Sequence, residues 1–300
     1  MSKGGFEGIL SDFRSYLKLE RSLSANTVAA YSRDAQFLFD YLKNEGITAV
    51  EDITGPYLTA YVESLSAAGM SKRSQARVIS SIKSLFRFLE DEGVVKENPC
   101  DMLDAPKMQK HLPSVLSVEE VTAILNSVDL SKPQGHRNRA ILEMLYSCGL
   151  RVSELVNLRI SDLFFDDGFI RVIGKGDKQR LIPVGEPAVK AVGLWMDIRR
   201  HWPVVRGCED CLFVNRRGRK MTREMVFLIV KEQAEVAGIH KEISPHTFRH
   251  SFATHMVENG ADLRVVQEML GHESILTTEI YTHIDTRKWQ ETILKFHPAG

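Results

Sequence analysis

The sequence is most informative at residues 244–250, which read Ser-Pro-His-Thr-Phe-Arg-His. Ser244 is a favoured helix N-cap, and Pro245 suits the first helical position because the N–H that it lacks would have no partner there. We therefore expect a helix with His246 in its first turn and Arg249 three residues later on the same face. The apolar side chains lie on the other face and are predicted to be buried: Phe248, Phe252 and Met256.

Two more short helices are expected directly downstream. Gly260 ends the first helix, and residues 262–270 predict a second one that Gly271 closes. His272 follows that glycine. A third helix comes next and places Tyr281 near its C-terminal end. Successive short helices and their junctions would thus present His, Arg, His and Tyr side chains.

A helix joint is predicted upstream, at residues 149–155, which read Gly-Leu-Arg-Val-Ser-Glu-Leu. Gly149 can adopt the left-handed conformation that ends a helix. Arg151 lies in the joint, and Ser153 and Glu154 begin the next helix. A second arginine is therefore placed on a rigid corner of the chain.

A β-hairpin is predicted between this joint and the quoted helix. Two β-type runs, at residues 169–173 and 180–184, flank the turn signal Gly-Lys-Gly-Asp at 174–177. The turn places Lys175 at the tip of the hairpin. It is not a nucleotide-binding P-loop, because it has neither the leading glycine nor the trailing Ser or Thr of that motif. The fold class expected is mainly α with a small antiparallel β-sheet.

The first third of the chain reads as helices at residues 26–44, 54–69 and 71–93. The third of these has an apolar stripe, formed by Val78, Ile79, Ile82, Leu85, Phe86 and Leu89. Its other side is basic and rich in hydroxyl groups, which suits phosphate contacts, although a solvated helix face is the plain alternative. That side consists of Arg73, Arg77, Ser80, Ser84 and Arg87.

A domain boundary is expected near residues 105–115, where prolines and lysines occur without apolar periodicity. Ser117 and Glu120 then form a capping box that begins a helix. The predicted organisation is a helical domain at 1–105, a linker at 106–115 and a second domain at 116–300.

Composition indicates a globular protein with locally basic segments. The 300 residues include 39 basic and 39 acidic ones, but residues 171–223 contain 13 Lys or Arg against 5 Asp or Glu. Such an imbalance fits a nucleic acid that touches one face. Four cysteines are too few for a disulfide framework. The N-terminal residues lack the apolar run of a signal peptide, no segment is long and apolar enough to span a membrane, and the expected compartment is the cytoplasm.

One chemistry explains why six scattered side chains would share a site: Arg151, Lys175, His246, Arg249, His272 and Tyr281. A tyrosine that attacks a phosphodiester creates a transition state with negative charge on the non-bridging oxygens. Arginine forks match that charge. Histidine titrates in the range needed for proton transfer, and a lysine can protonate the leaving deoxyribose oxygen. Neither a metal ion nor a nucleotide cofactor is then required.

At these residues the chain resembles the tyrosine site-specific recombinases of the phage-integrase family, and within them the Xer group. The matching pieces keep their family order: residues 149–155, 172–180, 246–255, 270–274 and 280–283. The resemblance implies an N-terminal helical core-binding domain that clamps DNA, followed by an α-rich catalytic domain with a small antiparallel sheet. Each fragment alone identifies the family only weakly, whereas all of them in order identify it specifically.

The resemblance also implies roles. Tyr281 is the nucleophile of a 3′-phosphotyrosine intermediate, Arg151 and Arg249 hold the phosphate, and Lys175 is the general acid. His246 and His272 complete proton transfer. Glu154 matches an acidic position that supports the site in relatives. Expected DNA contacts are Arg73, Arg77, Ser80, Ser84, Arg87, Lys178, Arg180, Arg216, Arg217, Arg219 and Lys220.

The implied assembly is a tetramer on two specific double-stranded DNA sites, with a Holliday junction intermediate. A C-terminal apolar face would dock on a neighbouring subunit; it consists of Trp289, Ile293 and Phe296. The Xer group further implies resolution of chromosome dimers at cell division, with a paralogous recombinase and a septal DNA translocase as partners.

Two alternatives stay open: an integrase or resolvase of a mobile element with the same chemistry, and an inactive architectural DNA-binding protein. The complete set of six residues argues against the second. Metal sites are less favoured. His246 and His250 have helical zinc spacing but no carboxylate between them, and Cys208 and Cys211 form a lone Cys-x-x-Cys without a second pair.

Overall fold

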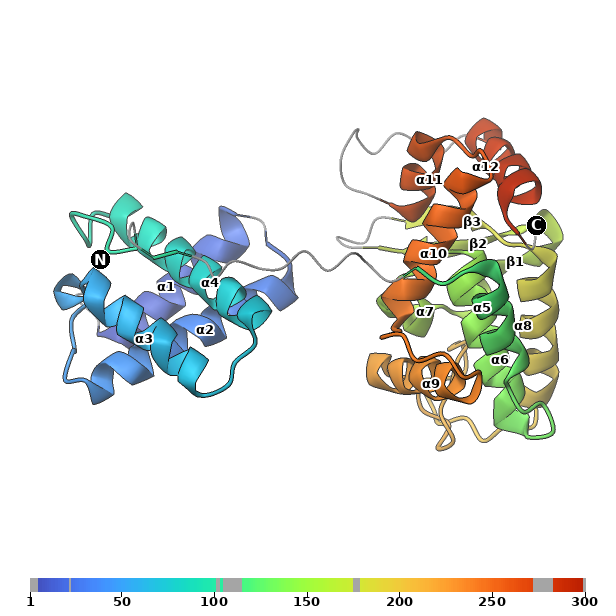
Figure 1. Cartoon of the computed structure of the whole chain (residues 1–300), viewed down its shortest axis with the longest axis horizontal. Helices are drawn as coiled ribbons and strands as arrows, with labels where there is room; N and C mark the ends of the chain where they lie inside the picture. Colours follow the sequence, from blue (N-terminus) through green and yellow to red (C-terminus); the bar gives the residue numbers. More distant parts are fainter. Residues whose placement is uncertain are drawn as a thin grey trace. The chain divides into compact units, whose positions relative to one another are not determined.

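The computed structural model describes residues 5–21, 23–100, 103–104, 115–174, 179–271 and 283–298. The chain divides into two compact units, Met1–His111 and Leu112–Gly300 (Figure 1). Each unit has its own hydrophobic core. The predicted linker at 106–115 lies almost wholly outside the described residues, so the domain boundaries expected from the sequence stay a prediction.

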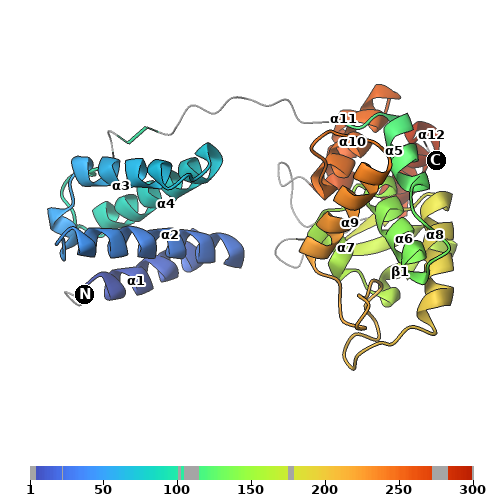
Figure 2. The same cartoon turned by 60° about the horizontal axis from the view of Figure 1, so that its bottom comes forward.

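The first unit is helical, as predicted. Its elements are α1 (Phe6–Leu19), α2 (Ala25–Asn44), the 3₁₀ helix η1 (Val50–Asp52), α3 (Gly55–Ala67) and α4 (Lys72–Asp91). Ser24 and Ser71 cap α2 and α4, because each side chain accepts a hydrogen bond of 3.2 Å from the backbone N–H three residues on. α1 and α2 lie side by side (Figure 2), and Phe6 stacks on Phe39 with ring centroids 4.2 Å apart.

A buried carboxylate ties α2 to α4. Asp34 is only 2% exposed. It forms an ion pair with Arg77 and accepts a hydrogen bond of 2.7 Å from the Ser81 hydroxyl. A buried carboxylate needs such partners, because burial disfavours its charge. Arg77 therefore has a structural partner besides its expected contact with DNA.

The second unit surrounds α6 (Pro133–Ser147), whose residues from 140 to 145 are almost fully buried. α6 packs against α5, α7, α8, α9 and α10. The other helices are α5 (Val118–Asn126), α7 (Val152–Asn157), η2 (Ile160–Asp162), η3 (Phe165–Asp167), α8 (Glu186–Arg199), α9 (Arg223–Val236), α10 (Pro245–Glu258), α11 (Leu263–Leu270) and α12 (His283–Phe296). The predicted capping box begins α5, with Ser117 and Glu120 bonded reciprocally at 2.8 and 3.2 Å.

The small sheet is antiparallel, with strand order β1-β2-β3. The predicted hairpin corresponds to β2 (Phe169–Ile173) and β3 (Gln179–Pro183), which pair from Phe169 opposite Pro183 to Ile173 opposite Gln179. A third strand, β1 (Leu163–Phe164), pairs with β2 and was not predicted. Two residues are too short for an alternating pattern to be visible in the sequence.

The C-terminal helix α12 packs on β3 and α10 of its own unit. Trp289 and Ile293 are almost fully buried in that core, and Phe296 packs against it. These are the side chains expected to dock on a neighbouring subunit. In this structure they cover apolar surface within the chain, because an exposed face of that size would be costly in water.

None of the described helices is long and apolar enough to cross a lipid bilayer. Cys148, Cys208 and Cys211 are free thiols. Cys100 and Cys148 are buried, whereas Cys208 and Cys211 are half-buried.

The joint between α6 and α7 requires glycine at position 149 for two reasons. Gly149 has a φ of +57°, which is the left-handed region predicted for it. A Cβ atom there would also stand 2.6 Å from the Phe252 ring and 2.9 Å from Leu270. We expect Gly149→Ala to lower the free energy of unfolding by about 2–4 kcal/mol, the sum of backbone strain and overpacking.

Gly238→Ala is the matched control for that substitution. Gly238 also has a positive φ, of +73°, but a Cβ there would meet nothing within 4 Å. Urea titration of both variants should give a loss of only about 1–2 kcal/mol for Gly238→Ala. Equal losses would contradict the packing explanation for Gly149.

Candidate active site

Arg249 is held deep in the second unit by α10. The helix begins as predicted at Ser244, whose backbone N–H donates to the Thr247 hydroxyl at 3.1 Å. Phe248 and Phe252 anchor its opposite face and are fully buried. Arg249 is 8% exposed, and its Nη1 and Nη2 donate to the carbonyls of Gly149 (2.7 Å) and Leu270 (2.6 Å). This arginine therefore joins the α6–α7 joint to the end of α11.

Arg151 lies in that joint, immediately before α7. Its backbone N–H donates to Glu154 Oε2 at 2.8 Å, and its Nη1 donates to Glu154 Oε1 at 2.9 Å. Its Nη2 reaches the carbonyl of Gly271 at 3.0 Å. The side chain remains 36% exposed, so one edge of this guanidinium faces solvent.

Glu154 and Arg180 form a buried, two-point ion pair. Nη1 and Nη2 of Arg180 donate to the two carboxylate oxygens of Glu154 at 2.8 and 3.0 Å, and Nε donates to the carbonyl of Met269 at 3.1 Å. Burial alone would raise the pKa of Glu154, but hydrogen bonds and charge from Arg180, with further hydrogen bonds from Arg151, outweigh it. The pKa of Glu154 is therefore below its usual range, and the carboxylate is ionised.

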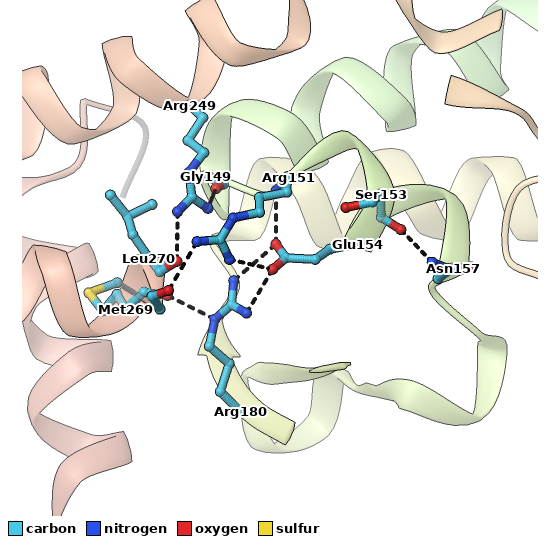
Figure 3. A network of polar contacts seen from close by, with 10 residues as sticks. Gly149, Arg151, Ser153, Glu154, Asn157, Arg180, Arg249, Met269 and Leu270 are labelled. Atoms are coloured by element: carbon cyan, nitrogen blue, oxygen red, sulfur yellow. Dashed lines mark hydrogen bonds and ion pairs between the residues drawn. The ribbon is translucent and has the colours of Figure 1, made fainter. Parts of the chain in front are cut away.

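Three guanidinium groups thus hold three successive carbonyls at the end of α11 (Figure 3). Met269 accepts from Arg180, Leu270 from Arg249 and Gly271 from Arg151. The last carbonyls of a helix have no partner within it, so outside donors are required. The arrangement fixes the point at which the chain leaves α11 and continues to residue 272.

Gly271 is necessary at this point. It has a φ of +66°, and a Cβ there would lie 3.3 Å from the Arg180 guanidinium. A larger residue would therefore strain the backbone and press on the Glu154–Arg180 pair. The sequence pattern that placed a glycine at the end of this helix is confirmed, and packing gives a second reason for it.

The network carries an excess of positive charge. Among the described residues, three guanidinium groups face one carboxylate, which leaves two positive charges uncompensated in a partly buried place. The pKa of Arg249 is lowered to about 10, chiefly by burial; the charges of Arg151 and Arg180 also lower it, and Glu154 opposes them. An anion with several oxygens, such as a phosphodiester, would relieve this repulsion, and the Nη groups retain donors for it.

The structure brings together two of the six predicted catalytic residues, Arg151 and Arg249. His246 lies in the first turn of α10 and is exposed, as is His250. The other three, and one expected DNA contact, lie outside the described residues: Lys175, His272, Tyr281 and Lys178.

Most of the expected DNA contacts that the structure describes lie on α4 or in the loop before α9. On α4, Arg73, Ser80 and Arg87 are exposed and Ser84 is half-buried, whereas Arg77 is paired with Asp34. In the loop before α9 the cationic side chains are exposed: Arg216, Arg217, Arg219 and Lys220.

Arg180 differs from this expectation. It is 6% exposed, and all three of its guanidinium nitrogens bond to Glu154 or Met269. Its position in a basic stretch of sequence suggested a DNA contact, but the side chain faces inward from β3. The structure gives it a positioning role instead.

A further inward-facing arginine was also missed. Arg199 is 8% exposed, and its Nη2 donates to the carbonyls of Cys208 (3.1 Å), Glu209 (2.8 Å) and Cys211 (2.7 Å). No sequence pattern distinguishes such an arginine from a surface one. Within the described residues, no three His, Cys, Asp or Glu side chains are grouped as metal ligands.

Comparison with protein families gives two matches. Residues 114–288 match the phage integrase family, and residues 10–93 match the N-terminal SAM-like domain of phage integrases. The two matches follow each other along the chain in the same order as the two structural units.

Individual relatives and solved structures agree with these matches. The chain is 39% identical to tyrosine recombinase XerD of Staphylococcus aureus, and the match covers 98% of this chain and 100% of that protein. It is 44% identical to XerD of Chlorobaculum tepidum, and that match covers 97% of this chain and 96% of that protein. A solved XerH recombinase on a palindromic difH substrate is 25% identical, with a TM-score of 0.69, over 94% of this chain and 83% of that one. A solved lambda integrase dimer on a core site shares the fold: it is 18% identical, with a TM-score of 0.68, and the match covers 93% of this chain and 100% of that chain.

The buried ion pair predicts a large loss of stability in Glu154→Gln. We expect the free energy of unfolding at pH 7 to fall by about 3–5 kcal/mol, because Arg180 would remain buried without its anion. Since the pKa of Glu154 is lowered in the folded state, its stabilisation is present above the unfolded pKa of about 4.3 and is lost as the pH falls through the folded pKa. The difference between wild type and variant should therefore shrink below about pH 4.

Glu143→Gln provides the control. Glu143 is also buried, but burial raises its pKa despite its bond of 3.0 Å to Arg139. Its charge therefore destabilises the folded state at neutral pH. We expect Glu143→Gln to lower the free energy of unfolding less than Glu154→Gln does. Urea titrations of both variants at pH 7 and pH 3.5 measure this, and equal losses at pH 7 would contradict the role given to the Glu154–Arg180 pair.

Proposed function

The chain belongs to the phage integrase family of tyrosine recombinases, and we propose that it cuts and rejoins DNA at a specific site through a transient bond between Tyr281 and a backbone phosphate. It is a DNA strand-exchange enzyme. The observation that supports the residue assignment is the convergence of Arg151, from the α6–α7 joint, and Arg249, from α10, in a network that is positively charged among the described residues.

In the proposed cleavage step the two arginines hold the non-bridging oxygens of the scissile phosphate. The Tyr281 hydroxyl oxygen attacks phosphorus and gives its proton to His246 or His272. The bond from phosphorus to the 5′ oxygen breaks, and Lys175 protonates that oxygen. The products are a 3′-phosphotyrosine and a free 5′-hydroxyl, and attack by the 5′-hydroxyl of another strand reverses the step.

Arginine suits this role because its fork keeps its charge and matches two oxygens at once. The pKa of Arg249, although lowered to about 10, leaves it protonated at neutral pH. The carbonyl contacts of Arg151 and Arg249 fix both forks before DNA binds, so little ordering is needed when the phosphate arrives. Glu154 and Arg180 act through the other two arginines and do not touch the phosphate.

We propose a Xer-type substrate, namely a chromosomal site at which dimeric chromosomes are resolved during cell division. This assignment is supported by identities of 39% and 44% to two XerD proteins over almost the whole chain. Four subunits on two sites, a Holliday junction intermediate, a paralogous recombinase and a septal DNA translocase belong to the same proposal. So does the cytoplasm, where the chromosome is accessible.

The proposed tetramer gives α12 a second possible position. Trp289 and Ile293 bury their side chains in the chain's own core. An exchange of α12 between neighbouring subunits would bury the same face in a partner and link the subunits without new apolar surface. The C-terminal docking segment expected from the sequence is retained in this form.

Tyr281→Phe should abolish covalent protein–DNA adducts on a nicked target and leave DNA affinity unchanged, because the hydroxyl is required only for bond formation. Trapping on a nicked suicide substrate, with the adduct resolved by denaturing electrophoresis, measures this. Tyr57→Phe, at a tyrosine packed on the core of the first unit, should retain adducts. Adducts that persist in Tyr281→Phe would exclude this residue as the nucleophile.

Adduct formation should continue in excess EDTA, because Arg151 and Arg249 supply the positive charge that a metal ion provides in other phosphoryl-transfer sites. The rate of adduct formation with and without the chelator is the measurement. A loss of activity that added magnesium restores would refute the metal-independent mechanism.

A further inference from the structure

A half-open pocket of about 650 Å³ lies between α1 and α2 in the first unit. Half of its lining is apolar, and the contributing side chains are Leu10, Leu23, Ala25, Val28 and Ala29. Leu10 and Val28 belong to the core, so the floor of the pocket is an opening onto core side chains. A volume of this size accommodates a small organic molecule.

The rim of the pocket is cationic. Arg14, Lys18 and Arg33 line it, and its lining contains no acidic residue. Among the residues that the structure describes, none of these three cations has an ion-pair partner. Three unpaired cations around an apolar floor attract a ligand that is both negatively charged and partly apolar.

The wall of the pocket also contains a buried hydroxyl group that has no hydrogen-bond partner among the described residues. Ser32 lines the pocket and is only 6% exposed, and its Oγ has no hydrogen-bond partner among the described residues. Buried hydroxyl groups are almost always hydrogen-bonded, but this oxygen is itself covered from solvent, so the cavity and its cationic rim, and not this hydroxyl, are what a ligand would meet. The remaining lining residue, Gln36, adds a second polar group on the same helix.

We propose that this pocket binds a small amphipathic anion, namely an organic acid with an alkyl or aryl body and a carboxylate head. The apolar body lies on Leu10, Leu23 and Val28. The head lies among the rim cations Arg14, Lys18 and Arg33. The site is separate from the arginine network of the second unit, and it would allow a metabolite to act on the helical unit of the recombinase.

DNA is the other anion that three cations could attract. A phosphodiester contact uses exposed side chains on a convex surface and leaves an apolar cavity empty. The cavity and its apolar floor would then have no role. These features favour the amphipathic acid, and the test must separate it from a phosphate.

Binding is measured on the full chain by displacement of the fluorescent probe 1-anilinonaphthalene-8-sulfonate. We expect decanoate to displace the probe at concentrations about threefold to tenfold lower than decanol, because only decanoate engages the cations. Inorganic phosphate should not displace it, because it lacks an apolar body. Equal competition by phosphate, or by decanol, would overturn the proposal.

Variants locate the site. Ala29→Phe, at an exposed residue of the lining, should fill the pocket and abolish displacement by decanoate. Arg14→Gln combined with Arg33→Gln should weaken decanoate about threefold to tenfold, whereas Arg21→Gln, at an exposed cation outside the lining, should not. Decanoate binding that survives Ala29→Phe in a folded protein would contradict the proposal.

DNA binding is the last measurement, and it tests whether the rim cations contact phosphate. Probe displacement by a short DNA duplex, together with a parallel loss of DNA affinity in Ala29→Phe, would show that the rim is a phosphate contact and would overturn the proposal. Unchanged DNA affinity in that variant, with decanoate binding lost, supports a separate ligand site. Circular dichroism confirms that each variant retains its helices. Neither outcome depends on the roles proposed for Tyr281 or the arginine network.

Discussion

One buried carboxylate allows three guanidinium groups to lie next to one another. Glu154 accepts hydrogen bonds from Arg151 and from both Nη groups of Arg180, and its charge also opposes the repulsion felt by Arg249. Without this carboxylate the arginines would repel one another in a region of low dielectric. The positions of the α6–α7 joint, of β3 and of the end of α11 all depend on this balance.

The same network explains how the proposed catalytic pair, Arg151 and Arg249, can be rigid before a substrate arrives. The carbonyls of Met269, Leu270 and Gly271 are held by three different side chains, so the end of α11 and the arginines fix each other. An enzyme that stabilises charge in a transition state gains most when its donors need no reorganisation. Two uncompensated positive charges remain, and a phosphate diester supplies only one negative charge, which leaves the site attractive to the extra charge that develops during the reaction.

Much of the fold could be predicted from local signals. Caps at Ser71, Ser117 and Ser244, the glycines at 149 and 271, and the hairpin were confirmed because each depends on a few adjacent residues. Arg151 and Arg249 were recognised as partners only through the ordered motifs, since nothing in their local sequence says that they meet. The inward orientation of Arg180 was not foreseen, because a basic stretch does not reveal which side chains face inward; the alternation of β3 buries it at a position that composition alone assigns to the surface. The apolar face of α12 was recognised, but its burial within the same chain depends on tertiary packing that periodicity does not encode.

We propose that Arg151 and Arg249 grip one phosphate while Glu154 and Arg180 stay behind them. A structure of the Tyr281→Phe chain on its DNA target tests this most directly through four interatomic distances. The account predicts that guanidinium nitrogens of both Arg151 and Arg249 lie about 2.7–3.2 Å from non-bridging oxygens of the same phosphate, with Arg180 still bonded to Glu154 and to Met269. A complex in which the two arginines contact different phosphates, or in which Arg180 leaves Glu154 to bind DNA, would contradict it.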